Sequence, residues 1–323
     1  MAHHSPIKVV FLDQDTLPDH IPLPTLRHPH HWQAYGATAP HAVIERLKEA
    51  DVAITNKVVL SDDILAALPN LKLIAVAATG VNNVDLDACR TRGIQVCHIQ
   101  GYAVQSVPEH VMALIFALKR QLMGYHNDVR QGEWQKHGQF CFFTHPIGRV
   151  AGSTLGIIGK GALGQAVAQL AQAVGMTVIF AEHQDASECR PGYQPFEQVI
   201  RQADVLSLHC PLTDKTQHLI NQDVLAKMPQ HAILINTGRG DLVDEQALLY
   251  ALKSGQIGGA GLDVLSEEPA PDAHPLVSAS LSNLIVTPHV AWGADDAVKT
   301  LVQQLVDNID GFFSGAPQHT LID

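Results

Sequence analysis

The sequence has few of the features that mark secreted, membrane-spanning or nucleic-acid-binding proteins. Its five cysteines are scattered and never stand in CxxC spacing, which argues against a disulfide framework and a zinc site. No apolar run reaches the roughly 18 residues of a membrane span, and no long apolar segment near the start indicates a secretory signal. The formal charge of -11, without a cluster of Lys and Arg, disfavours nucleic-acid and membrane partners. We therefore expect a cytoplasmic protein.

Histidine is abundant, with 19 residues, and two local concentrations suggest a metal site. One is the pair His3 and His4, and the other is HPHH at 28–31. Their spacing matches no known ligand pattern, and Pro29 interrupts the second group. We expect a solvated loop there and no bound metal.

Apolar runs alternate with helical segments along the first hundred residues. The strand-like runs are IKVVFL (7–12), DVAIT (51–55), LKLIAVAA (71–78) and GIQVCHI (93–99). Ser61 stands where a helix N-cap is expected, directly before DDILAAL. Runs that are apolar throughout predict parallel strands that are buried on both faces.

A second alternating series begins at residue 153 and supplies six strand candidates. They are STLGIIG (153–159), MTVIF (176–180), DVLSLH (204–209), AILIN (232–236), GAGLDV (259–264) and NLIVT (283–287). Six parallel strands with helices between them are typical of a doubly wound dinucleotide-binding domain.

A chain of 323 residues exceeds what one core usually serves. The spacing also predicts one long helix over 107–125 and a final amphipathic helix that returns to the first domain. We therefore predict an α/β protein with two Rossmann-like or flavodoxin-like domains, each a doubly wound parallel sheet, and a cleft between them. Residues 1–103 with 290–323 would form the substrate-binding domain, and 104–289 the dinucleotide-binding domain.

The loop GKGALG fits the pattern G-x-G-x-x-G with Gly159, Gly161 and Gly164. Alone this pattern is weak, because glycines also serve ordinary tight turns. Here an apolar strand precedes the loop and a helix follows it directly. The helix N-terminus then offers free N–H groups and the positive end of its dipole to a pyrophosphate.

Glu182 ends the next strand, 18 residues after Gly164 (182 − 164). An acidic side chain at this place accepts hydrogen bonds from the hydroxyls of the adenosine ribose. A carboxylate also repels a 2′-phosphate, which favours NAD over NADP, although His183 beside it could weaken that exclusion.

Titratable residues follow three successive strands of the second series. Arg239 stands between two glycines after one strand, Asp263, Glu267 and Glu268 follow the next, and His289 follows the last, directly after Pro288. The carboxyl ends of strands line the ligand crevice in open α/β sheets. We therefore expect these side chains to gather at one site.

The residue types suit the reduction of a 2-oxo acid by hydride. Histidine can give a proton to the carbonyl oxygen, and a carboxylate partner would orient its ring. Arginine supplies a planar, permanently charged fork for the substrate carboxylate. On spacing alone, Arg239 and Glu268 could also form a structural ion pair.

Several longer motifs identify a family. VAATGVNNVD, GKGALG, HCPLTDKT, INTGRGDLVDEQAL, GLDVLSEEP and TPHVAW together resemble the D-isomer-specific 2-hydroxyacid dehydrogenases over nearly the whole chain. TNKVVLS (55–61), ATGVNNVD (78–85) and FCFFTHPIGRVAG (140–152) look most like the glycerate (hydroxypyruvate) dehydrogenase branch. The chain departs from the commoner pattern at Glu182, usually aspartate, and at Ala78, where many relatives have serine.

The resemblance implies roles for individual residues. Arg239 would clamp the substrate carboxylate and carbonyl, and His289 would act as the acid/base with Glu268 as its partner. The backbone amides of Thr79 and Gly80 would hold the substrate carboxylate from the other domain. The further residues implied to bind the cofactor are Val107, Ala162, Leu163, Cys210, Pro211, Thr216, Thr237, Gly238 and Asp263.

Individual roles are also expected for Asp263, Lys57 and Trp292. Asp263 would face the nicotinamide carboxamide. Lys57 would face the cleft by analogy, with a solvated surface position as the alternative. Trp292 would shape the substrate pocket or pack the domain interface.

The implied activity is NAD(H)-dependent interconversion of hydroxypyruvate or glyoxylate with D-glycerate or glycolate, by a homodimer joined through 107–125 and the stretch that follows. D-lactate dehydrogenase activity is an alternative within the same family. The phosphite-oxidising branch carries lysine where Thr79 stands here, and the formate-oxidising branch has glutamine in place of Glu268. A dinucleotide-sensing, corepressor-like binding protein is the alternative from another class.

Overall fold

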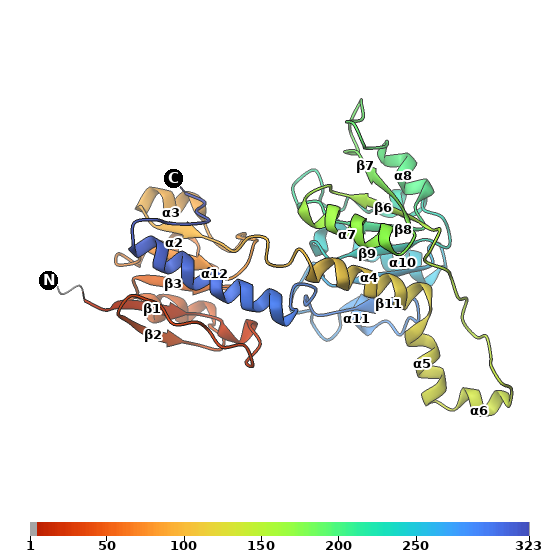
Figure 1. The fold of residues 1–323 in the computed structure, drawn as a ribbon, viewed down its shortest axis with the longest axis horizontal. Coiled ribbons are helices and arrows are strands. Elements are labelled where there is room, and N and C mark those ends of the chain that lie inside the picture. Colours follow the sequence, from red (N-terminus) through yellow and green to blue (C-terminus); the bar gives the residue numbers. More distant parts are fainter. Residues whose placement is uncertain (1–4, 323) are drawn as a thin grey trace. The chain divides into compact units, whose positions relative to one another are not determined.

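The structure is a computed structural model that describes residues 5–322, so His3 and His4 lie outside the described residues. The chain forms two compact units (Figure 1). Unit 1 comprises the chain up to Ala103 and from Gly293 onward, and unit 2 comprises Val104–Trp292. In the described part of the chain, no helix is long and apolar enough to cross a membrane.

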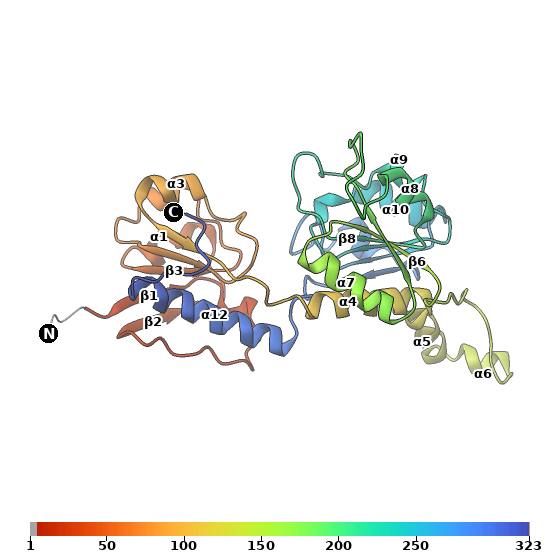
Figure 2. The same cartoon turned by 45° about the horizontal axis from the view of Figure 1, so that its top comes forward.

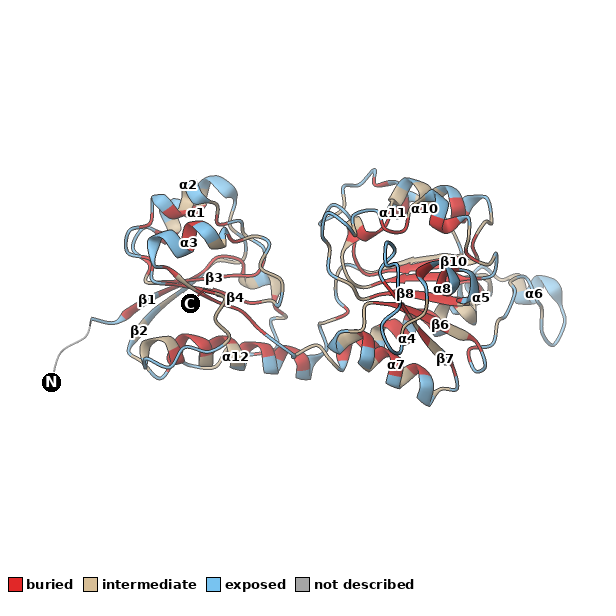
Figure 3. Cartoon of the chain, turned by 90° about the horizontal axis from the view of Figure 1, so that it is seen from above, coloured by how far each residue is buried: buried red, intermediate tan, exposed pale blue. Residues whose placement is uncertain are grey.

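Unit 1 contains a five-stranded parallel sheet in the order β2-β1-β3-β4-β5. Its strands are β1 (Ile7–Phe11), β2 (His30–Ala34), β3 (Val52–Thr55), β4 (Leu73–Val76) and β5 (Gln95–Cys97). Its helices are α1 (Val43–Leu47), α2 (Asp62–Ala66), α3 (Leu86–Arg92) and α12 (Asp295–Phe313), with short 3₁₀ turns at Gln14–Thr16 and Pro40–Ala42. Figure 3 shows α1, α2 and α3 on one face of the sheet and α12 on the other. Every residue of β3 and β4 is buried, as the continuous apolar runs predict.

The N-terminal segment differs from the prediction in one respect. The sequence predicts a solvated loop at 28–31, but β2 begins at His30 and pairs with β1 in the register Ile7↔His30. As an edge strand β2 is only partly covered, so it lacks the apolar pattern by which the other strands are recognised. Ser61 is the N-cap of α2 as predicted, although its side chain makes no capping hydrogen bond.

Unit 2 contains a six-stranded parallel sheet in the order β11-β10-β9-β8-β6-β7. Its strands are β6 (Thr154–Ile158), β7 (Thr177–Ala181), β8 (Val205–Leu208), β9 (Ile233–Asn236), β10 (Gly259–Leu262) and β11 (Leu284–Val286). Its helices are α4 (Ser106–Lys119), α5 (Leu122–Arg130), α6 (Glu133–His137), α7 (Ala162–Ala173), α8 (Phe196–Gln202), α9 (Gln222–Leu225), α10 (Glu245–Lys253) and α11 (Pro275–Ser278), with a 3₁₀ turn at Gly240–Leu242. All six strands are those predicted from the sequence. The chain passes from β6 to β7 on one side and then to β8 on the other, which makes the ends of β6 and β8 the switch point of the sheet.

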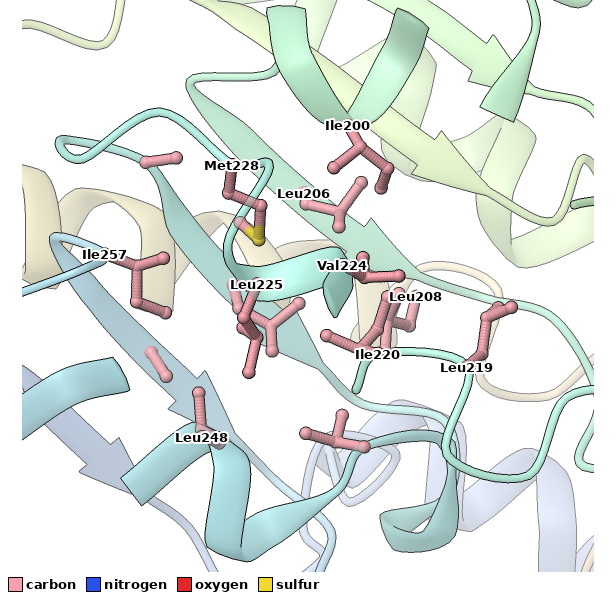
Figure 4. Close-up of a cluster of buried hydrophobic side chains, with 14 of the residues drawn as sticks. Ile200, Leu206, Leu208, Leu219, Ile220, Val224, Leu225, Met228, Leu248 and Ile257 are labelled. Atoms are coloured by element: carbon pink, nitrogen blue, oxygen red, sulfur yellow. The ribbon is translucent and has the colours of Figure 1, made fainter. Parts of the chain in front are cut away.

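Helices cover both faces of this second sheet. In Figures 2 and 3, α4 and α7 lie on one face and α8 and α10 on the other. Figure 4 shows the core beneath the second group, where Leu206 and Leu208 of β8 lie among side chains of the neighbouring helices and loops. The buried side chains that complete it include Ile200, Ile220, Val224, Leu225, Met228, Leu248 and Ile257. This core supports the carboxyl ends of the central strands, where the predicted site residues lie.

The long helix predicted over 107–125 is two helices. α4 ends at Lys119, and Gln121 takes the left-handed conformation with φ 54° before α5 begins. The chain returns at Gly148, whose N–H donates to the Lys119 carbonyl at 2.7 Å. This contact from a distant segment satisfies a helix end that the local sequence does not mark.

The boundary between the units lies after Trp292 and not after His289. Val290 and Ala291 donate their amides to Asp263, and Trp292 Nε1 donates to the His289 carbonyl at 2.8 Å. These bonds bind the loop after β11 to unit 2. α12 packs against β4 in unit 1, where the sequence predicts that the last helix returns.

Candidate active site

His289 and Glu268 form a close pair in unit 2. His289 Nδ1 lies 2.6 Å from Glu268 Oε2, and Glu268 Oε1 accepts a hydrogen bond from Leu265 N at 3.1 Å. Both side chains are partly exposed. The carboxylate orients the imidazole ring, which leaves Nε2 as the nitrogen that can exchange a proton with a substrate.

The backbone of His289 is left-handed, with φ 55°. This conformation costs a non-glycine residue on the order of 1 kcal/mol, so neighbouring contacts must compensate. The His289 amide donates to the Asp263 carbonyl at 2.8 Å. The Asp263 carboxylate accepts from Thr287 Oγ1 at 2.6 Å, Val290 N at 2.9 Å and Ala291 N at 2.8 Å. Asp263 thus holds the loop that presents His289.

Asp263 has a second neighbour that sequence reasoning does not find. His110 of α4 lies with Nε2 3.0 Å from Thr287 Oγ1 and 3.6 Å from Asp263 Oδ1. The Asp263 side chain is only 1% exposed. A carboxylate offers about four acceptor positions, and the loop after β11 takes three of them. One position remains for the predicted contact with a nicotinamide carboxamide.

Arg239 follows β9 and is half-buried, with Nη1 donating to the Gly238 carbonyl at 2.7 Å. A Cβ at Gly240 would lie 1.9 Å from the Leu265 carbonyl carbon, so only glycine allows the two loops to approach each other. Among residues 5–322 Arg239 makes no ion pair, so the alternative of a structural pair with Glu268 finds no support. The guanidinium remains available for an anionic ligand.

In unit 1, the loop after β4 directs two amides to the same side. The Ala78 carbonyl accepts from Ile99 N at 3.0 Å, and the Thr79 carbonyl lies 2.8 Å from His98 Nδ1. A trans peptide sends its C=O and N–H in opposite directions, so the N–H groups of Thr79 and Gly80 both point away from these partners. Within the described chain neither amide has an acceptor. Adjacent free N–H groups of this kind suit a carboxylate.

Lys57 lies in unit 1 after β3. Its amide donates to Asp13 Oδ2 at 2.6 Å, and the buried Asp13 carboxylate also accepts the amides of Asn56 and Val58. Asp13 therefore shapes the backbone that carries Lys57.

The glycine loop lies at the switch point of the unit 2 sheet. Gly159 has φ 101°, and a Cβ there would meet the His209 backbone at 2.5 Å. A Cβ at Gly164 would lie 2.0 Å from the Gly159 carbonyl oxygen. Both glycines are therefore required by the protein's own packing.

Gly161 is different, because a Cβ there would meet nothing within 4 Å. It is the N-cap of α7, so its open surroundings lie beside the unpaired amides of the first helical turn, including Ala162 and Leu163. Space at the middle glycine together with a helix N-terminus fits a pyrophosphate.

The other predicted cofactor residues surround the same strand ends. Thr237 Oγ1, directly after β9, is buried and has no hydrogen-bond partner within the described residues, which fits a site that a ligand completes. Cys210 and Pro211 follow β8, and Thr216 Oγ1 lies 2.8 Å from the Pro211 carbonyl. Burial raises the pKa of the Cys210 thiol to about 11, so this side chain is uncharged at neutral pH. Val107 is buried in the first turn of α4, and Gly238 lies between Thr237 and Arg239.

Glu182 follows β7 at the far end of the glycine loop and is paired with Arg190. Oε1 accepts from His183 N at 2.9 Å and from Arg190 Nη2 at 2.5 Å. Oε2 accepts from Arg190 N at 2.9 Å and from Arg190 Nε at 2.8 Å. The side-chain hydrogen bonds from Arg190 hold the pKa of this carboxyl at about 2.

Known proteins match both the sequence and the fold. A family model described as D-isomer specific 2-hydroxyacid dehydrogenase, NAD binding domain, matches residues 112–291. Glycerate dehydrogenase of Methylorubrum extorquens is 49% identical over 317 residues, which cover 97% of this chain and 98% of that protein. The chain belongs to the D-isomer-specific 2-hydroxyacid dehydrogenase family. It is therefore an oxidoreductase of 2-hydroxy acids that uses a nicotinamide dinucleotide, as its motifs predict.

Two further proteins are similar to this chain, one in sequence and one in structure. Hydroxypyruvate reductase of Blautia hydrogenotrophica is 36% identical over 281 residues, or 85% of this chain and 86% of that one. The structure of D-lactate dehydrogenase from Aquifex aeolicus, complexed with NAD and lactic acid, matches with a TM-score of 0.80 at 28% identity, over 95% of this chain and 96% of that chain.

Three residues of the site carry no sequence motif. His98 acts on Thr79 and His110 on Thr287, each across a long stretch of chain. Arg190 lies eight residues after Glu182 in a segment without regular structure. The contacts of the first two depend on the fold, so no local pattern predicts them. For Arg190, a cation shortly after the strand-end carboxylate was the only available signal.

Proposed function

We propose that the protein reduces hydroxypyruvate or glyoxylate to D-glycerate or glycolate with NADH, and catalyses the reverse reaction. The pair between His289 Nδ1 and Glu268 Oε2 at 2.6 Å carries this proposal. A histidine oriented in this way on the loop after β11 suits an acid/base role, and the glycine loop belongs to the same unit. The preference among 2-hydroxy acids rests on the similarity to glycerate dehydrogenase and hydroxypyruvate reductase.

The substrate carboxylate would be bound by the Thr79 and Gly80 amides and by the guanidinium of Arg239. Backbone N–H groups and an arginine fork both favour a planar anion. Arg239 would also stabilise negative charge that develops on the carbonyl oxygen.

His289 would complete the reduction by giving its Nε2 proton to the oxygen that becomes the 2-hydroxyl. Glu268 would stabilise the imidazolium before that transfer. When bound, the dinucleotide supplies the hydride that adds to C2. In the oxidative direction His289 would take the hydroxyl proton back.

Cofactor binding would involve the amides of the first turn of α7 at the pyrophosphate and residues after β8 and β9 near the adenosine and nicotinamide. The glycine loop, the space at Gly161 and the unpartnered Thr237 Oγ1 support this assignment. The loop after β11 would place Asp263 beside the carboxamide.

The substrate assignment is tested by loss of NADH absorbance with hydroxypyruvate, glyoxylate, pyruvate and 2-oxobutyrate in parallel. We expect kcat/KM for hydroxypyruvate to exceed that for pyruvate by at least about tenfold. Pyruvate lacks the 3-hydroxyl, so polar groups of the site that would hydrogen-bond this hydroxyl would have no partner when pyruvate is bound. A preference for pyruvate would favour D-lactate dehydrogenase. Inert 2-oxo acids with intact NADH binding would favour phosphite oxidation or a dinucleotide-sensing role.

We further propose that the enzyme is a cytoplasmic homodimer. Its five free cysteines fit a reducing compartment.

Apolar side chains of α5, α6 and the following loop are exposed, namely Leu122, Met123, Val129, Trp134, Phe140, Phe143 and Ile147. Figure 1 shows these helices extending away from the sheet of unit 2. Exposed apolar surface of this kind supports an interface with a second copy.

A further inference from the structure

The ribose end of the proposed cofactor site contains a carboxylate that is already occupied. A carboxylate has about four acceptor positions, and Glu182 fills them with two backbone amides and two guanidinium N–H groups. No position remains for the 2′- and 3′-hydroxyls of a ribose unless Arg190 moves away. The sequence interpretation of Glu182 as an acceptor for the ribose hydroxyls does not include this pairing with Arg190.

Arg190 brings a cation to the place where a bare carboxylate would repel a 2′-phosphate. Its side chain is 54% exposed even though the guanidinium is held by Glu182. Arg190 Cζ also lies 4.2 Å from the centre of the Tyr193 ring, which supports the guanidinium from a second direction. Of its five N–H groups, Nε and Nη2 use one each on Glu182, so three are left to bind an anion.

A second cation lies at the same ring. Lys160, within the glycine loop, has Nζ 4.9 Å from the centre of the Tyr193 ring and 4.8 Å from that of Phe180. Its nearest hydrogen-bond acceptor is the Gly192 carbonyl at 3.4 Å. Lys160, Arg190 and Glu182 together carry +1 + 1 − 1 = +1, so the two cations outweigh the one carboxylate that Arg190 pairs with.

We propose that Arg190, with Lys160 beside it, accepts the 2′-phosphate of NADP(H), so that the enzyme uses both NADPH and NADH. Glu182 holds the guanidinium in place for the phosphate instead of excluding it. An arginine fork is well matched to phosphate, and its prior fixation by Glu182 and Tyr193 reduces the ordering cost of binding. This inference rests on the proposed dinucleotide site and concerns its specificity.

The test measures nucleotide binding without turnover. The wild-type protein is titrated calorimetrically with 5′-AMP and with 2′,5′-ADP, which differ only by the 2′-phosphate. We expect 2′,5′-ADP to bind at least as tightly as 5′-AMP. In Arg190→Gln, the ratio of Kd for 2′,5′-ADP to Kd for 5′-AMP should rise by about tenfold or more, because a charge-assisted phosphate contact is lost.

The matched control is Arg201→Gln. Arg201 is similarly exposed, at 60%, and pairs with Glu197 on α8 at 3.6 Å, away from the glycine loop. It should leave the ratio unchanged. Lys160→Gln provides a second variant if Arg190→Gln does not fold, and should raise the same ratio by a smaller factor.

The outcomes separate the two proposals. If wild type binds 5′-AMP but binds 2′,5′-ADP more than about tenfold more weakly, the specificity inference is wrong and the dinucleotide site stands. The same conclusion follows if the variants that fold leave the ratio of the two Kd values unchanged. If neither nucleotide binds, both proposals fail. A matching rise in KM for NADPH, but not for NADH, in Arg190→Gln would extend the result to the full cofactors.

Discussion

At the residue scale, the position of His289 depends on a buried carboxylate that does not touch its ring. Asp263 accepts the amides of Val290 and Ala291 and the hydroxyl of Thr287, and its own carbonyl accepts the His289 amide. The left-handed backbone of His289 is thus held from both sides. The orientation of the imidazole ring is determined separately, by the contact between His289 Nδ1 and Glu268.

Replacing His289 by Gln should lower kcat for the 2-oxo acid by about 10²–10⁴-fold, because the proton donor is lost while the site retains its shape. Binding of NADH, measured by fluorescence titration, should stay within about threefold of wild type. Glu268→Gln keeps an acceptor for Nδ1 but removes the charge, and should cost less than His289→Gln. Near-normal turnover in His289→Gln would contradict its assignment as the acid/base.

At the scale of elements, the loop after β4 is held through its carbonyls, and the Thr79 and Gly80 amides, which we propose bind the substrate carboxylate, have no acceptor within the described residues. His98, in the segment after β5, lies with Nδ1 2.8 Å from the Thr79 carbonyl, and its Nε2 lies 2.7 Å from Gln100 Nε2. This arrangement requires the tautomer with the proton on Nδ1. We therefore propose that His98 is a positioning residue, because its ring contacts the carbonyl of the peptide whose N–H is the Gly80 amide.

His98→Ala should raise KM for the 2-oxo acid by about tenfold with a smaller effect on kcat, because the freed peptide no longer holds its amide in the binding direction. His98→Asn, whose amide can donate near the position of Nδ1, should restore most of the loss. Steady-state kinetics with both variants provide the measurement. If His98→Ala lowers both kcat and thermal stability, and His98→Asn restores neither, the role of His98 is purely structural.

At the scale of the whole molecule, the chain closes unit 1 with its C-terminal segment. Gln95 Nε2 donates to the Ile322 carbonyl at 2.5 Å, His98 N donates to the His319 carbonyl at 3.2 Å, and α12 packs on β4. Both ends of the chain therefore contribute to one core. Unit 2, a continuous segment, carries the exposed apolar side chains of α5, α6 and the loop after them.

The double substitution Phe140→Ser and Phe143→Ser should weaken the proposed dimer. These side chains are 93% and 78% exposed in the single chain, and each would contribute on the order of 2 kcal/mol if buried against a second copy. We expect the dimer Kd to rise by at least about 100-fold, seen as a shift to monomer in size-exclusion chromatography with light scattering. Val59→Ser, at an exposed apolar position in unit 1 that is not part of the proposed interface, is the control. A monomeric wild type would refute the proposal.

The sequence by itself determines the six strands of unit 2, the glycine loop and the titratable residues that follow three successive strands. These features are local, because apolar runs predict strands, and the end of a parallel strand defines the edge at which the next side chains lie. Gly159 and Gly164 are recognisable for the same reason, since a tight turn between strand and helix requires them. The pairing of Glu268 with His289 was instead implied by the resemblance to the dehydrogenase family, and the two side chains lie 2.6 Å apart.

Only the tertiary structure decided the features that depend on contacts across the chain. The break after Lys119 needs Gly148, strand β2 needs the edge of β1, and the role of His98 needs the loop after β4. The pairing of Arg190 with Glu182 belongs here too, because it turns a residue that suggests exclusion of a phosphate into one that holds a cation. A sequence shows which groups are present, whereas packing determines which of their hydrogen-bonding positions are already taken.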